Sequence, residues 1–167
     1  MEGEVEGKVI LIVGRKKCGK TTKLLELLKP VNKDAIRLHD VSKKARVELD
    51  YNRPVQSYEA FKQECNSLSN CVFVYEEATI FIRHSPDEDL LNFLVTARHA
   101  GNTSIFIFHS LRSVPHFIWD QADFLFLYKS KDTLSLVETK FQDQELTEIY
   151  KRVNASPNPH ANEFYEI

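Results

Sequence analysis

The stretch Lys8-Val-Ile-Leu-Ile-Val-Gly14-Arg-Lys-Lys-Cys-Gly19-Lys20-Thr21-Thr22 decides the fold of this 167-residue chain. Five consecutive apolar residues, Val9–Val13, predict a buried strand, and the leucine-rich residues 23–29 predict a helix directly after the stretch. Between them lies the spacing G-x-x-x-x-G-K-T, whose glycines leave backbone N–H groups accessible in a tight loop. The spacing carries chemical meaning because a strand precedes it and a helix follows it.

This loop predicts a binding site for a nucleoside triphosphate. Backbone N–H groups and the N-terminus of the next helix attract phosphate oxygens. Lys20 is expected to reach the β- and γ-phosphates, and Thr21 is expected to offer its hydroxyl to Mg²⁺, so ATP and Mg²⁺ are the expected cofactors. The expected nucleotide-binding residues are Gly14, Arg15, Lys16, Lys17, Cys18, Gly19, Lys20, Thr21 and Thr22.

Length and composition limit the class of protein. A chain of this length is about one domain, which we expect to cover residues 1–153. The cysteines, Cys18, Cys65 and Cys71, are odd in number and form no C-x-x-C pair, which excludes a disulfide framework and a four-cysteine zinc site. No signal peptide pattern and no membrane-spanning segment is evident, so a cytoplasmic location is expected.

Charge is unevenly distributed along the chain. The formal net charge is −2, but residues 1–53 carry 13 Lys/Arg against 8 Asp/Glu, and the remainder carries 9 against 16. Such asymmetry permits a basic face on an acidic body, which suits a polyanion. A solvated surface is the alternative, since several of these cations belong to the phosphate loop itself.

Apolar runs alternate with helical periods, which predicts an α/β fold: a single P-loop NTPase domain with a mainly parallel central sheet flanked by helices, of the RecA/ASCE-like class. The expected strands are Val9–Val13, 35–38, 71–75, 104–108 and 123–128. The alternating residues 133–141 are expected to form a hairpin with the last of these.

Helix signals fall between these runs. Ser57 is a predicted N-cap, and residues 85–88 combine a capping box with a proline and first-turn acids, so a helix is expected from there to about His99 with Gly101 as its stop. A last amphipathic helix is expected around residues 146–153. Residues 154–167 begin with a polar, proline-containing segment and are expected to form a flexible tail.

Two adjacent acids follow the apolar run 71–75. Glu76 and Glu77 would lie at the carboxyl end of a strand, where ligands bind in open α/β sheets. We assign Glu76 to the magnesium ion and Glu77 to the polarisation of the attacking water. A solvated surface pair is the alternative, although carboxylates next to a wholly apolar strand need a partner.

A third segment points to a family. It reads Thr96-Ala-Arg98-His99-Ala-Gly101-Asn-Thr-Ser-Ile105-Phe-Ile-Phe-His109-Ser-Leu-Arg112-Ser-Val-Pro115, followed by Trp119-Asp-Gln-Ala-Asp123. With the loop and the acids, it resembles the FtsK/HerA superfamily of ring ATPases, particularly the small virus-type genome-packaging ATPases, over residues 8–130. In that family an Arg near a Gly precedes a strand that ends in a polar sensor, and a loop resembling S-x-x-x-x-P follows.

The resemblance implies roles for further residues. Arg98 would be an arginine finger that acts on the adjacent subunit, Arg112 would be a second candidate for it, and His109 would be the sensor, where the family commonly has Gln. The first acid of the family is usually Asp, so Glu76 lengthens that side chain by one methylene. Arg98 could instead balance the carbonyls of a helix end, and His109 could be a core histidine.

The resemblance also implies a function and partners. The chain is expected to hydrolyse ATP in order to package or translocate viral or mobile-element DNA, as a homo-oligomeric ring of about five or six subunits. A capsid or portal-type protein would be a partner, and the location would be the host cytoplasm or the virion. The expected nucleic-acid contacts are Lys43, Lys44, Arg46 and Arg53, with Tyr51 able to stack on a base.

Other functions remain open at this point. The loop and its leucine-rich helix also resemble thymidine-kinase-type nucleoside kinases, but the cysteine positions cannot build the zinc-bound lobe of those enzymes. A third possibility is an ATP-dependent assembly switch with little hydrolysis. Such a switch would show no stimulation by DNA.

Overall fold

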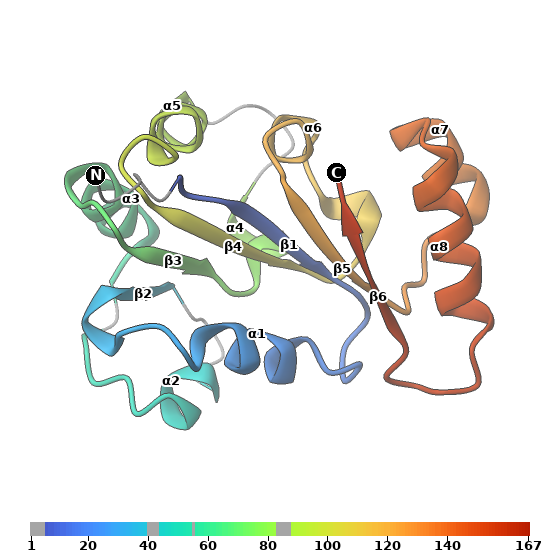
Figure 1. The fold of residues 1–167 in the computed structure, drawn as a ribbon, viewed down its shortest axis with the longest axis horizontal. Coiled ribbons are helices and arrows are strands. Elements are labelled where there is room, and N and C mark those ends of the chain that lie inside the picture. Colours follow the sequence, from blue (N-terminus) through green and yellow to red (C-terminus); the bar gives the residue numbers. More distant parts are fainter. Residues whose placement is uncertain (1–5, 40–43, 55, 83–87) are drawn as a thin grey trace.

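The computed structural model describes residues 6–39, 44–54, 56–82 and 88–167, and within these ranges six strands form one sheet (Figure 1). The strand order is β2-β3-β4-β1-β5-β6, and every pairing is parallel except that of β5 with β6. This confirms the predicted fold class, a mainly parallel sheet flanked by helices. The strands are β1 (Val9–Val13), β2 (Ile36–His39), β3 (Val72–Tyr75), β4 (Thr103–Phe108), β5 (Phe124–Tyr128) and β6 (Asn162–Glu166).

Helices cover both faces of the sheet (Figure 1). They are α1 (Lys20–Leu28), α2 (Lys44–Glu48), α3 (Tyr58–Ser67), α4 (Ala78–Phe81), α5 (Glu88–Ala97), α6 (His116–Trp119), α7 (Leu134–Phe141) and α8 (Gln144–Ala155). Short 3₁₀ turns, η1 (Lys33–Ala35) and η2 (Leu111–Ser113), connect some of them. In the described ranges no helix combines the length and apolar character that crossing a membrane requires.

The strand side chains divide the core into two layers. Leu11 on β1 and Phe106 on β4 are register partners, and both belong to the cluster that also holds buried residues of α3, α5 and α8. Ile12 and Ile107 are also partners, and they point to the opposite face, where they join Leu24 of α1. This division follows from the two-residue period of a strand. It explains why β1, at the centre of the sheet, is wholly apolar, since parallel strands inside a sheet are buried on both faces.

Several predicted boundaries are confirmed. The β1 strand has the predicted bounds, and the Ser57 side chain accepts a hydrogen bond from the N–H of Ala60 (3.2 Å) as the N-cap of α3. Helix α5 ends at Ala97, and Gly101 has the left-handed φ of 69° that favours glycine after a helix. The predicted capping residues 85–87 lie outside the described residues.

The predicted strand at residues 133–141 is wrong, because these residues form helix α7. The side chain of Thr133 accepts a hydrogen bond from the N–H of Leu136 as an N-cap, and Val137 is fully buried. Alternation of apolar residues suggested a strand, but Leu134, Val137 and Phe141 also fit the helical spacing. Residues 133–141 therefore do not pair with β5, and the free edge of that strand is occupied by another segment.

That segment is the C-terminus, so the predicted flexible tail is wrong for residues 162–166. Strand β6 pairs antiparallel with β5, with Leu125 opposite Tyr165. The Tyr165 hydroxyl donates a 2.5 Å hydrogen bond to Asp143, whose carboxylate also accepts from the N–H of Leu146 at the start of α8. Pairing with an existing edge orders a segment whose own apolar content is low, because the main chain supplies the hydrogen bonds.

The bond between Tyr165 and Asp143 generates a stability prediction. We expect Tyr165→Phe to lower the free energy of unfolding by about 1–3 kcal/mol, since a buried hydrogen bond to a charged group is lost. Asp143→Asn keeps an acceptor and a cap, so its loss should be smaller. Urea denaturation followed by circular dichroism measures both, and an unchanged midpoint for Tyr165→Phe would contradict the anchoring of β6.

Candidate nucleotide-binding site

The glycine loop leaves the carboxyl end of β1 and is tied to the ends of two neighbouring strands. The N–H of Gly14 donates to the carbonyl of Phe108 (3.1 Å), and the N–H of Arg15 donates to the carbonyl of Lys129 (2.8 Å). A Cβ at Gly14 would lie 2.4 Å from the Cβ of Tyr128, so no side chain fits there. Gly19 has a φ of 107°, which other residues rarely adopt.

Lys20 is buried at the centre of this loop, with 7% of its surface exposed. Its Nζ donates to the carbonyl oxygens of Gly14 (2.6 Å) and Arg15 (2.8 Å). Burial lowers the pKa of Lys20, and the carboxylates of Glu77 and Glu76 act in the opposite direction. An ammonium held in this position can bind a phosphate group placed over the loop.

The other predicted loop residues divide by exposure. Arg15, Lys16 and Lys17 are exposed, whereas Cys18 is 1% exposed. Burial raises the pKa of the Cys18 thiol, so it remains protonated and contributes packing inside the loop. Its backbone N–H remains a candidate phosphate contact.

The predicted acids lie opposite the loop. Glu76 and Glu77 follow the carboxyl end of β3, and Glu77 has a left-handed backbone (φ 58°) at the start of α4. Strand β4 lies between β1 and β3, so its following residue, His109, stands between the loop and the acids.

His109 connects Lys20 with Glu77. Its Nε2 lies 2.5 Å from the Glu77 Oε2, and its Nδ1 lies 3.4 Å from the Lys20 Nζ. The ammonium of Lys20 can only donate, so Nδ1 faces it as an acceptor and Nε2 carries the proton that is donated to Glu77. The predicted sensor, base and phosphate-binding lysine therefore form one hydrogen-bonded chain.

These residues line a hollow of about 490 Å³ that also includes Thr21, Thr22 and Glu76. Its size lies within the range of ligand pockets. The Thr21 hydroxyl and the Glu76 carboxylate are hard oxygen donors, which fit Mg²⁺. Among the described residues no cluster of three or more His, Cys, Asp or Glu side chains could hold a metal.

Arg98 lies at the end of the sheet opposite to this hollow, where β1 and β5 begin. Its Nη1 is 2.9 Å from Asp123 Oδ1, and its Nη2 donates to the carbonyl of Gln121 (2.9 Å). Asp123 also accepts from the N–H of Val9, at the end of β1 that is remote from the loop. Arg98 therefore has a structural role within its own subunit, and it could act on a nucleotide only in a neighbour.

Arg112 lies in η2, after β4, and its loop is held from both sides. The Asp132 carboxylate accepts from the N–H groups of Leu111 (2.8 Å) and Arg112 (3.2 Å), and Lys140 Nζ donates to the carbonyls of the same two residues. Arg112 itself is exposed. No hydrogen bond or ion pair of its guanidinium occurs within the described part of the chain.

The segment that carries the expected nucleic-acid contacts packs partly against the rest of the fold. Lys43 lies outside the described residues, and Lys44 opens helix α2. Arg46 stacks 4.9 Å above the ring of Tyr51, whose hydroxyl accepts from the N–H of Leu38 on the edge strand β2 (3.2 Å). The side chain of Tyr51 is therefore already engaged in contacts within the fold.

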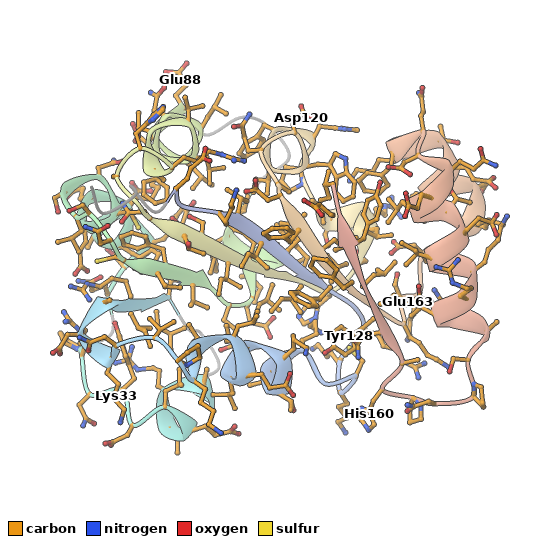
Figure 2. The ribbon with its side chains drawn as sticks, viewed as in Figure 1. Lys33, Glu88, Asp120, Tyr128, His160 and Glu163 are labelled. Carbon is orange, nitrogen blue, oxygen red and sulfur yellow. The ribbon has the colours of Figure 1, made fainter. Side chains whose placement is uncertain are left out.

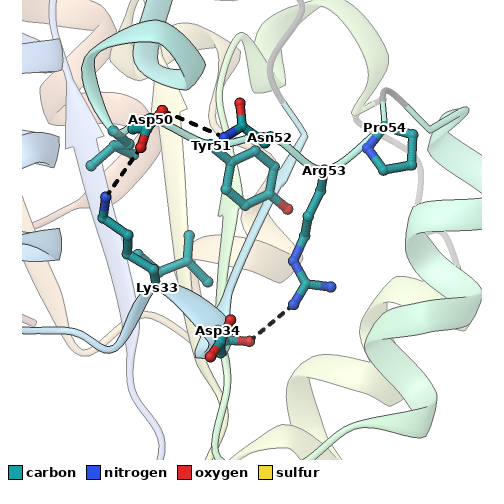
Figure 3. A pocket seen from close by; sticks show the side chains of 9 residues that line it. Lys33, Asp34, Asp50, Tyr51, Asn52, Arg53 and Pro54 are labelled. Carbon is teal, nitrogen blue, oxygen red and sulfur yellow. Dashed lines mark hydrogen bonds and ion pairs between the residues drawn. The ribbon is translucent and has the colours of Figure 1, made fainter.

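Figure 3 shows the hollow of about 520 Å³ beside this segment. Arg53 donates to the carbonyl of Asp34 (3.3 Å), and Lys33 pairs with Asp50 (3.8 Å). Two cations, Lys33 and Arg53, and two acids, Asp34 and Asp50, line the hollow, so its formal charges balance.

Sequence reasoning missed two residues beside the loop. Tyr128 ends β5, and His160 belongs to the segment between α8 and β6; Figure 2 shows both near the turn from β1 into α1. His160 lines the hollow that contains Lys20 and Glu77. The position of Tyr128 at a strand end was a usable signal, whereas nothing local in the sequence places His160 there.

Comparison with known proteins supports the fold. No family model matches the chain, and no curated protein matches it. Among solved structures, the genome packaging NTPase B204 from Sulfolobus turreted icosahedral virus 2 in complex with ATP-gammaS has a TM-score of 0.71 at 15% identity, over 99% of this chain and 98% of that one. B204 in complex with AMP gives 0.73 at 17% identity, covering 96% and 92%.

A weaker structural similarity is to a protein from a different organism. The N-terminal domain of zonular occludens toxin from Neisseria meningitidis has a TM-score of 0.56 at 12% identity, covering 75% of this chain and 78% of that one. At 15–17% identity, the matches to B204 show a shared fold over nearly the whole chain.

The contact between His109 and Glu77 generates a prediction. Glu77→Gln keeps an acceptor for His109 but removes the carboxylate, so we expect unchanged nucleotide affinity and a loss of ATP hydrolysis of about 10²–10⁴-fold. Binding by calorimetry and phosphate release separate these effects. The exposed Glu138→Gln is the control, and hydrolysis that survives in Glu77→Gln would exclude Glu77 as the base.

Proposed function

We propose that this chain is an ATP-hydrolysing motor that packages or translocates DNA as a homo-oligomer. The observation that carries the proposal is the convergence of Lys20, His109 and Glu77 at the carboxyl ends of β1, β4 and β3. A phosphate-binding lysine facing a carboxylate across a hollow is what hydrolysis of a terminal phosphate requires. The packaging ATPases with the same fold support the choice of DNA as the cargo.

Each residue has a distinct task in this mechanism. Loop N–H groups and Lys20 would bind the phosphates, and Thr21 and Glu76 would hold Mg²⁺, which neutralises charge on the phosphate oxygens. Glu77 would orient the attacking water and accept its proton. His109 would position Glu77 through the 2.5 Å contact. Because His109 also contacts Lys20, it would couple the position of Glu77 to whether phosphate is bound at the loop.

Efficient hydrolysis would require a neighbouring subunit. A guanidinium in trans stabilises the charge on the transferred phosphoryl group and is worth about 10³–10⁵ in kcat. Arg98 is the candidate by resemblance, and its distance from its own hollow fits a role in trans. Arg112 is the candidate by geometry, because it is exposed and its loop is held rigidly by Asp132 and Lys140.

DNA would be contacted through phosphates by the basic segment that contains Lys43, Lys44, Arg46 and Arg53. Such contacts give sequence-independent and strongly salt-dependent binding. A ring of about five or six subunits would surround the DNA, and a capsid or portal-type protein would anchor the ring. The protein would then work in the host cytoplasm or on the virion.

The positions of the cysteines weaken the nucleoside-kinase alternative. Cys18, Cys65 and Cys71 are buried, free and on separate elements, so they do not form a zinc-bound lobe. An assembly switch with little hydrolysis shares the binding residues and differs in its turnover. Turnover therefore decides between the motor and the switch.

The motor proposal predicts the response of the ATPase to concentration and DNA. The rate per subunit should rise with protein concentration, because the finger comes from a neighbour, and rise further with duplex DNA. Phosphate release measured over a dilution series with and without DNA tests this. A rate per subunit that stays flat in both series would remove the ring motor and favour the switch.

Mixing experiments identify the finger. A subunit without the trans arginine disables its neighbour's site, so small fractions of Arg98→Ala in wild-type protein should reduce activity more than in proportion to that fraction. Arg112→Ala is tested in parallel, and its melting temperature should be unchanged, whereas Arg98→Ala also loses an ion pair. Strictly proportional loss for one variant would exclude that residue as the finger.

A further inference from the structure

A second hollow, of about 360 Å³, adjoins the one that holds Lys20. Its walls come from separate parts of the chain: Lys23 and Glu26 of α1, Tyr128 at the end of β5, and His160 and Asn162 at the C-terminus. Gly19, Thr22 and His160 line both hollows. The two hollows therefore adjoin each other at the loop.

The order of residues along this site sets the direction of a bound nucleotide. Glu77 and His109 line the first hollow and not the second, so the phosphate to be cleaved would lie in the first hollow. Gly19 and Thr22 mark the boundary with the second hollow. A triphosphate with its γ-phosphate at Glu77 thus directs its α-phosphate toward Thr22 and its sugar into the second hollow.

The second hollow contains groups suited to a sugar and a base. Tyr128 is 3% exposed, its side chain lines the hollow, and burial raises its pKa to about 12, so the hydroxyl stays protonated as a donor. No hydrogen bond of that hydroxyl occurs in the described part of the chain. The Glu26 carboxylate, 2.5 Å from Lys23 Nζ, can accept from a ribose hydroxyl.

His160 supplies a flat ring at the junction. The ring is exposed, and its Nδ1 would lie 3.8 Å from a Cβ placed on Gly19. The segment is held in place because Lys129 Nζ donates to the carbonyl of Ser156, the N–H of His160 donates to Asn158 (2.9 Å), and β6 pairs with β5. An imidazole on a segment whose backbone is held in this way can stack on a base.

We propose that this second hollow, between Tyr128, His160 and α1, binds the nucleoside half of the triphosphate, with Tyr128 and His160 as its contacts. The proposal rests on the nucleotide binding of the proposed function and assigns to the C-terminal segment a direct part in the site. The phosphates are bound by the loop, whereas the sugar and base are bound by Tyr128 at the end of β5 and by His160 between α8 and β6.

The test compares ATP with inorganic tripolyphosphate on the full-length chain. His160→Ala should weaken ATP binding about tenfold, and Tyr128→Phe should weaken it about threefold. Both variants should change tripolyphosphate binding less than ATP binding, because that ligand lacks a nucleoside. Calorimetry gives both affinities, and His116→Ala, an exposed histidine on α6, is the matched control.

The outcomes separate the two proposals. Equal losses for ATP and tripolyphosphate, or unchanged ATP affinity in both variants, would overturn the nucleoside site and leave the proposed function standing. Wild-type protein that binds neither ligand would overturn both. Thermal unfolding of each variant is measured alongside, so a loss of ATP binding is attributed to the site only where the melting temperature matches that of the wild type.

Discussion

The burial of one ammonium group is the constraint on which the site depends. Lys20 is nearly inaccessible, and removing its charge from water costs free energy that the carbonyls of Gly14 and Arg15 and the nearby acids offset. The loop can close around the lysine only because its glycines allow it. The result is a positive centre inside the loop, which is complementary to a phosphate chain.

Strand order brings the remaining groups to that centre. Residues 20, 77 and 109 are far apart in sequence. They meet because β4 lies between β1 and β3, and the carboxyl ends of these three parallel strands lie at the same end of the sheet. The same parallel arrangement places Arg98 at the opposite end of the sheet, near the beginnings of β1 and β5. The two ends of the sheet therefore separate the groups around Lys20 from Arg98.

The C-terminal third shows how a fold adds residues to a site. Helix α7 supplies Lys140 to the loop of Arg112, and β6 carries the segment with His160 back to the phosphate loop. Neither element was predicted correctly, since residues 133–141 alternate like a strand and residues 154–167 have little apolar content. Both are decided by contacts with β5 and α8, which a local pattern does not contain.

By itself, the sequence determined the phosphate loop, the apolar strands, the acids at positions 76 and 77 and the α/β class, because each depends on residues close together in the chain. Only the tertiary structure decided that His109 joins Lys20 to Glu77, that Arg98 pairs with Asp123, and that Tyr128 and His160 adjoin the loop. These relations depend on strand order and on the edge that β6 occupies. Such long-range pairings are selected by packing over the whole domain rather than by the propensity of any one segment.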